Sequence, residues 1–186
     1  MKNLYILLFL LFTCHFSFAQ EWFDGKCDIE AKVDQAAYKN AKVKNILTII
    51  IDQNNNIILN DKPHKQMSQV RFKEYVLDFI TNPENTKTSA ESPESAIIAL
   101  TSFGEKEKMQ LIQKYVREVY LYLWNQKSEE VYNSSWMDLK CAKREKVLKK
   151  HYPYNLIELK DDMDSEKSKD MKIPSPPRFE GDVKDN

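Results

Sequence analysis

The feature that most constrains the fold is a β-branched apolar run followed by an asparagine-rich turn. Residues 43–52 read VKNILTIIID, a composition typical of a buried strand. The next four residues, 53–56, include three asparagines, which tolerate the left-handed backbone of tight turns. The apolar residues 57–59 supply a returning strand, and residues 60–63 end it. The pattern therefore predicts a β-hairpin and requires a sheet.

Three amphipathic segments predict helices. Residues 68–81 place Val70 and Phe79 on an apolar stripe, begin at a capping Ser68 and stop before Pro83. Residues 105–126 form the strongest helical pattern, and residues 136–151 form a third helix with a basic outer face. The stripe of the second helix comprises Met109, Ile112, Val116, Val119, Tyr120 and Leu123. Its further aromatic residues are interpreted as core rather than as a ligand platform.

Two further apolar segments, at residues 95–102 and 156–159, are predicted strands. A hairpin followed by crossover helices gives a small mixed β-sheet with helices packed on one face. We therefore expect an α+β fold of the two-layer sandwich type.

Composition shifts divide the chain into four parts. Residues 1–19 have a lysine, an apolar run and small residues before a cleavage site, which is typical of a secretory signal peptide. Residues 20–42 form a polar N-terminal segment, residues 43–160 the α+β domain, and residues 161–186 a charged, proline-containing tail expected to be disordered. This organisation predicts a periplasmic or otherwise exported protein.

Two cysteines remain after removal of the predicted signal peptide, Cys27 and Cys141. In an oxidising compartment such a pair can form a disulfide, which would join the N-terminal segment to the C-terminal third of the chain. Two separate thiols, one of them on a buried helix face, are the alternative that the sequence leaves open.

Charge and motifs exclude several classes of function. Lysine and arginine total 28, as do aspartate and glutamate, so the chain lacks the basic excess of a dedicated nucleic-acid binder. The three glycines, Gly25, Gly104 and Gly181, cannot form a glycine-rich phosphate loop. His64 and His151 belong to no metal-binding or nucleophile motif. We predict no enzymatic activity, no cofactor and no metal.

The third predicted helix carries the one candidate binding surface. Its basic residues are Lys140, Lys143, Arg144, Lys146, Lys149 and Lys150. A basic helix face is usually solvated, and an anionic partner is the sharper alternative.

Several stretches, taken in order, resemble the periplasmic domain of ExbD/TolR biopolymer-transport proteins, in particular ExbD-like proteins of Bacteroidetes-type bacteria. The matching segments are KNILTIIIDQNNNIILNDKP, FKEYVLDFITNPEN, AIIALTS, MQLIQKYVREVYLYLWNQKSEEVY and KVLKKHYPYNLIEL. They correspond to the strand–turn–strand opening, the first helix with its Asn-Pro stop, the next strand, a long helix, and a short helix with a Tyr-Pro exit. The resemblance spans residues 43–160.

The resemblance implies an envelope protein that acts through protein–protein contacts, as an accessory of TonB/ExbB-type biopolymer transport. It implies partners in that system, a homodimer as one assembly, and membrane association only through partners. The family's uncleaved membrane helix bears an aspartate, whereas residues 4–12 here contain no acid, so proton coupling is not carried over. The alternative is an exported binding module for peptidoglycan or another anionic polymer.

Overall fold

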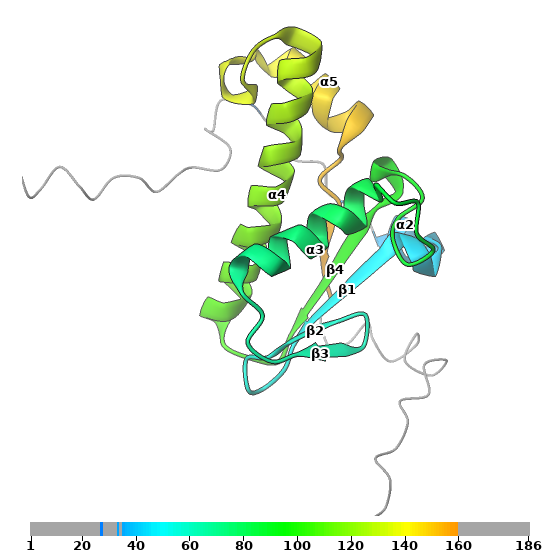
Figure 1. Cartoon of the computed structure of the whole chain (residues 1–186), viewed down its shortest axis with the longest axis vertical. Coiled ribbons are helices and arrows are strands. Elements are labelled where there is room, and N and C mark those ends of the chain that lie inside the picture. Colours follow the sequence, from blue (N-terminus) through cyan, green and yellow to red (C-terminus); the bar gives the residue numbers. More distant parts are fainter. Residues whose placement is uncertain (1–26, 28–32, 34, 160–186) are drawn as a thin grey trace, which may run out of the picture.

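A computed structural model describes residue 27, residue 33 and residues 35–159. The predicted signal peptide at 1–19 and the predicted tail at 161–186 lie outside the described residues. The described chain confirms the α+β class, with helices packed against a mixed five-stranded sheet (Figure 1).

The sheet combines an antiparallel edge with a parallel half. Its spatial order is β3-β2-β1-β4-β5. The strands are β1 (Ile46–Ile51), β2 (Ile57–Leu59), β3 (Lys62–His64), β4 (Ile97–Ser102) and β5 (Leu156–Glu158). Strands β1, β2 and β3 pair antiparallel, and β4 and β5 add in parallel, with Ile49 of β1 opposite Leu100 of β4. The predicted hairpin and the two predicted later strands are all present.

Local hydrogen bonds explain the hairpin turn. One carboxylate oxygen of Asp52 accepts from the backbone N–H groups of Asn54 and Asn56, each at 2.8 Å. Asn55 adopts a left-handed conformation, with a φ of 62°. The turn thus uses asparagines at the positions where the sequence predicted them.

Strand β3 was not predicted, because residues 60–63 were interpreted as the end of the hairpin. Asn60 and Asp61 both have positive φ values, 45° and 64°, so they form a second tight turn that returns the chain along β2. Pro63 lies within β3, which is possible because β3 is an edge strand of the sheet.

Three helices pack on one face of the sheet. In Figure 1, α3 crosses in front of β1 and β4, while α5 lies beside the upper part of α4. Their bounds are α3 (Gln69–Thr81), α4 (Lys106–Tyr132) and α5 (Cys141–His151). Short 3-10 turns precede β1, β4 and α5, namely η2 (Val43–Asn45), η3 (Pro93–Ser95) and η4 (Trp136–Asp138).

Helix α3 begins and ends as predicted. Ser68 accepts a hydrogen bond from Arg71 N at 3.3 Å, and Asn82 ends the helix in the left-handed conformation. The assignment of Val70 to the apolar stripe is wrong, since 64% of that residue is exposed. The buried residues are Phe72, Val76, Phe79 and Ile80, so the inward face starts two residues later.

Helix α4 supplies the centre of the core. It extends six residues beyond the predicted end, to Tyr132, and buries Ser128 in the additional turns. Most of its predicted stripe is buried, and Trp124 joins it. These side chains form one apolar cluster with Leu47, Ile49 and Ile51 of β1 and with α3. The interpretation of Tyr120 and Trp124 as core is therefore confirmed, whereas Tyr122 is 49% exposed.

The opposite face of the sheet carries a smaller apolar cluster. Ile97 and Ala99 of β4 meet Ile157 of β5 there, together with Leu159. Helix α2 (Gln35–Asn40) and its neighbours cover this cluster through Tyr38, Ala41 and Val33. Strand β4 is consequently buried on both faces, which explains why its sequence is continuously apolar.

Candidate interaction site at the α4–α5 corner

A rigid corner joins α4 to the basic helix α5. Helix α4 ends at Asn133, which adopts a left-handed conformation with a φ of 50°. The side-chain oxygen of Asn125 then accepts from Trp136 N at 3.1 Å and from Ser135 Oγ at 3.0 Å. The Trp136 ring stacks on Trp124, with ring centres 4.9 Å apart. These contacts fix where α5 begins.

Arg144 is the exception among the predicted basic surface residues, because it is buried, with 4% of its surface exposed. Its Nε donates to the carbonyl of Trp136 at 3.0 Å, and Nη2 donates to the carbonyl of Met137. Nη1 lies 3.9 Å from Cys27 Sγ. Placing Arg144 on the exposed face is therefore wrong. Its guanidinium instead donates to the carbonyl of Met137 and to that of Trp136, which also accepts from Leu139 N at 3.2 Å within the η4 turn.

A spacing signal in the sequence could have placed Arg144 inside. The buried residues of α5 are Arg144, Val147 and Leu148, which follow the i, i+3, i+4 spacing of one helix face. Arg144 was assigned to the exposed face because it is charged. The spacing of Val147 and Leu148 indicates instead that it points inward.

The structure pairs the two cysteines. Cys27 and Cys141 form a disulfide with a Cα–Cα distance of 5.4 Å across 114 residues of sequence. Cys141 is the first residue of α5, so the bond ties the N-terminal segment to the corner. Of the two alternatives that the sequence left open, the disulfide is the one formed.

The five remaining basic residues of the predicted surface are exposed: Lys140, Lys143, Lys146, Lys149 and Lys150. Lys149 pairs with Glu145 at 2.6 Å, and Lys143 Nζ lies 4.8 Å from the ring centre of Tyr132. Within the described ranges, Lys140, Lys146 and Lys150 make no ion pair. We call these five lysines the basic face.

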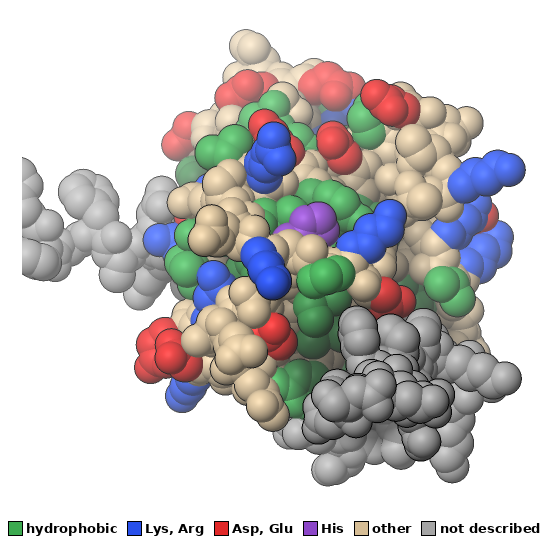
Figure 2. Space-filling view, turned by 60° about the horizontal axis from the view of Figure 1, so that its bottom comes forward, with side chains coloured by type: hydrophobic (Ala, Val, Ile, Leu, Met, Phe, Trp, Pro, Cys, Tyr) green, Lys and Arg blue, Asp and Glu red, His purple; other side chains and the backbone are tan. Residues whose placement is uncertain are grey.

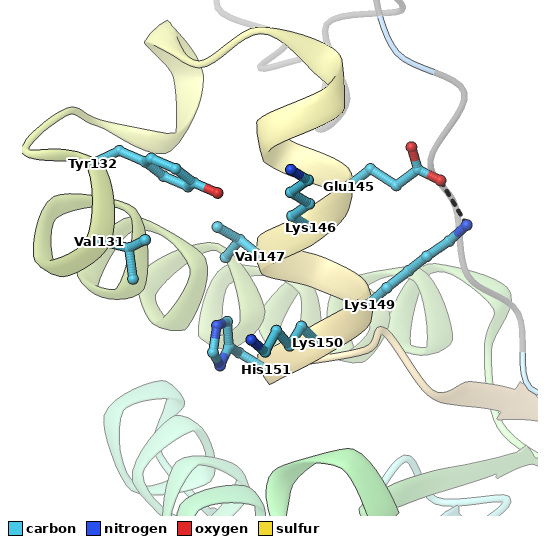
Figure 3. A pocket seen from close by; sticks show the side chains of 8 residues that line it. All are labelled: Val131, Tyr132, Glu145, Lys146, Val147, Lys149, Lys150 and His151. Carbon is cyan, nitrogen blue, oxygen red and sulfur yellow. Dashed lines mark hydrogen bonds and ion pairs between the residues drawn. The ribbon is translucent and has the colours of Figure 1, made fainter.

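Part of the basic face borders a groove of about 460 Å³. The α4 side consists of Val131 and Tyr132, and the α5 side consists of Glu145, Lys146, Val147, Lys149, Lys150 and His151. Figure 3 shows the Glu145–Lys149 pair on the far side of α5 from Val131 and Tyr132. Lys146 and Lys150 are thus the unpaired charges at an opening whose lining is mainly apolar.

The pKa of His151 depends on the charges around the groove. Burial lowers the pKa of His151 below its ordinary value of 6.5, and the positive charges of Lys127 and Lys150 lower it further. Glu94 and Glu130 act in the opposite direction but do not outweigh these effects. The imidazole is therefore neutral at pH 7 and lies in a positive field.

The surface charge is mixed on the side of the molecule that Figure 2 shows. Figure 2 shows another side of the molecule, where Lys and Arg side chains are interspersed with Asp and Glu around a central group of hydrophobic side chains. His64 lies on β3 with its ring 6.3 Å from that of Tyr75, and so belongs to a different part of the fold from His151.

The described residues contain neither a membrane-spanning helix nor a cluster of potential metal ligands. No helix in residues 35–159 combines the length and apolarity needed to span a membrane. In the same part of the chain, no three His, Cys, Asp or Glu side chains are grouped so that they could hold a metal ion.

Comparison with protein-family models, with curated proteins and with solved structures finds no match for this chain. The candidate site is therefore defined by its own geometry: a rigid corner, an exposed basic face and an apolar groove beside it.

Proposed function

We propose that the protein is a non-enzymatic, ExbD-like envelope protein that acts through protein–protein contacts as an accessory of TonB/ExbB-type biopolymer transport. The observation that carries the proposal is the order of elements. A strand, an asparagine turn and a second strand precede α3, and β4, the long α4, the short α5 and a Tyr-Pro exit follow. This is the order in which residues 43–160 resemble the ExbD/TolR periplasmic domain.

The disulfide supports the exported location that the proposal needs. Disulfides persist in oxidising compartments such as the periplasm and are rare in the reducing cytosol. The Cys27–Cys141 bond connects segments 114 residues apart, so the described fold depends on a bond that such a compartment favours.

A second candidate function, binding of peptidoglycan or another anionic polymer, is favoured by the basic face. Five exposed lysines follow one another along and just before α5, and such a surface attracts a polyanion without needing a shaped pocket.

Fractionation of the native host tests the two functions. An affinity-tagged chain is cross-linked in intact cells, and both the detergent-solubilised membrane and the sedimented cell wall are probed. Recovery of the tag with inner-membrane proteins of a TonB/ExbB-type system is expected. Recovery only with the cell wall would replace the leading function by the polymer-binding one.

A further inference from the structure

We propose that the α4–α5 groove is a docking site for an acidic protein segment that places one apolar side chain against Val131 and Tyr132 and flanking carboxylates beside Lys146 and Lys150. The proposal deepens the function above, since it rests on a role in protein–protein contact and specifies the chemistry of the partner.

The shape of the site favours an apolar anchor. Val131 is 48% exposed on the last turn of α4, and the buried Val147 forms part of the opposite wall. The aromatic ring of Tyr132 adds to the α4 wall. A side chain the size of leucine or methionine would cover this lining and remove apolar surface from water.

The charges of the site favour acidic groups around that anchor. Lys146 and Lys150 are exposed at the groove and have no ion-pair partner in the described chain. Glu145 and Lys149 also line it, on the side away from Val131, and neutralise each other as an ion pair (Figure 3). The carboxylates of a docked segment would complement these two ammonium groups. The amide backbone of a peptide can carry an apolar and an acidic side chain a few residues apart, which matches the apolar lining beside the two lysines.

An extended polyanion fits the groove less well. A carbohydrate polymer offers few aliphatic groups for the exposed surface of Val131 and Tyr132, and it would contact Lys140 as readily as Lys150. The two kinds of ligand can therefore be separated by variants inside and outside the groove.

The test uses the full, oxidised chain and a fluorescein-labelled twelve-residue peptide with one leucine flanked by glutamates. Anisotropy should report saturable binding that weakens with salt. The double variant Lys146→Glu/Lys150→Glu should raise Kd by about tenfold or more. Val131→Ser should raise it by roughly threefold to tenfold, because it removes apolar contact without disturbing a buried residue. A peptide with serine in place of leucine should lose a similar factor.

Lys140→Glu is the matched control, since Lys140 lies on the basic face but not in the groove. Less than a twofold change in Kd is expected for it. If Lys140→Glu weakens binding as much as either groove lysine and Val131→Ser has no effect, the surface binds polyanions and the docking proposal is overturned. Absence of peptide binding at millimolar concentration overturns it as well.

His151 gives an independent readout. The groups that act on it are Lys127 and Glu130 of α4, Lys150 of α5 and Glu94 of η3. A bound carboxylate would raise the pKa of His151, so the peptide should bind more tightly as pH falls from 7.5 to 5.5. Imidazole NMR titration with and without peptide measures this shift, and an unchanged His151 pKa in the complex would place the peptide elsewhere and overturn the proposal.

Experiments also test whether the groove is occupied by a second copy of the chain or by the chain's own C-terminal tail. Sedimentation that shows dimers dissociated by Val131→Ser would assign the groove to a second copy of the chain. Peptide binding that strengthens at least tenfold on deletion of residues 161–186 would assign it to the chain's own acidic tail. Either result overturns docking of a separate partner. All of these measurements use purified protein, so failure of the groove proposal is distinguishable from failure to find transport partners in cells.

Discussion

The two halves of α4 are held in place by different chemistry. The first half contributes Ile112, Val116 and Val119 to the apolar core, and its polar contacts, such as the Lys73–Glu118 ion pair, lie outside that core. The second half meets α5 at the corner. An indole stack, the buried guanidinium of Arg144 and a disulfide stabilise this corner. Apolar burial is tolerant of detail, because many side chains contribute, whereas the corner depends on a few directional contacts.

The sharpest way to break the sheet half is Val116→Asp. Val116 is fully buried among side chains that offer no partner for a carboxylate, so the variant should not fold. Circular dichroism and a thermal melt measure the loss. Lys114→Asp, on the exposed side of the same helix, should change the free energy of unfolding by less than about 0.5 kcal/mol. A cooperative melt for Val116→Asp would show that α4 does not pack on the sheet.

Arg144→Met is the corresponding test of the corner. It keeps an apolar stem but leaves the carbonyl of Met137 without its Arg144 donor and the carbonyl of Trp136 with Leu139 N alone, which should cost about 1–3 kcal/mol. The free energy of urea unfolding measures the loss. Lys146→Met, two residues further along on the exposed face of α5, should change it by less than about 0.5 kcal/mol. Equal small effects would mean that the buried guanidinium is unimportant to the corner.

Gly104→Ala tests close packing at the end of the sheet half. A Cβ at this position would lie 2.5 Å from Asn55 Oδ1 and 2.7 Å from the backbone oxygen of Asp52. We expect a loss of about 1–3 kcal/mol in the free energy of unfolding. Asn55→Ala removes only the first overlap, so the double variant should remain less stable than Asn55→Ala alone. Full recovery would contradict the backbone clash.

The smallest expected effect concerns an exposed ion-pair cluster that ties η2 to the segment before β4. Hydrogen bonds from Lys44, then Lys42 and Asn45, lower the pKa of Glu91 from 4.5 to about 2. A depressed carboxyl pKa stabilises the fold above pH 4.5, and that contribution is lost as pH falls towards 2. Glu91→Gln should therefore be slightly less stable than the parent at pH 6 and equal to it near pH 2. Urea unfolding at both values checks this, and a difference that persists at pH 2 would contradict the linkage.

The sequence predicted most of the sheet half because its signals are local. The apolar run of β1, the asparagine turn, the Ser68 cap and the Asn82 stop each depend on neighbouring residues. Strand β3 escaped prediction because KPH has no apolar pattern and is created by a left-handed turn at Asn60 and Asp61. Val70 was misplaced because the helical period alone does not show where the inward face begins.

The corner was predicted only in part because its key contacts join distant residues. The lysines of the basic face follow from composition. The helical spacing of α5 could have indicated that Arg144 points inward, but not that it donates to Trp136 and Met137 or lies beside Cys27. The groove likewise forms only when the last turn of α4 lies beside α5. The sequence therefore predicted the charge of the site but not its apolar lining.

The disulfide closes residues 27–141 into a covalent ring that contains four of the five strands, while β5 enters the sheet from the chain beyond the ring. A single backbone cut inside the ring, for example in the exposed stretch 84–88, leaves every element attached until the disulfide is reduced. A cut at residues 152–155 instead separates β5 from the rest. Covalently, the oxidised protein is a ring followed by a linear segment, and the parallel pairing of β4 with β5 joins that segment to the sheet of the ring.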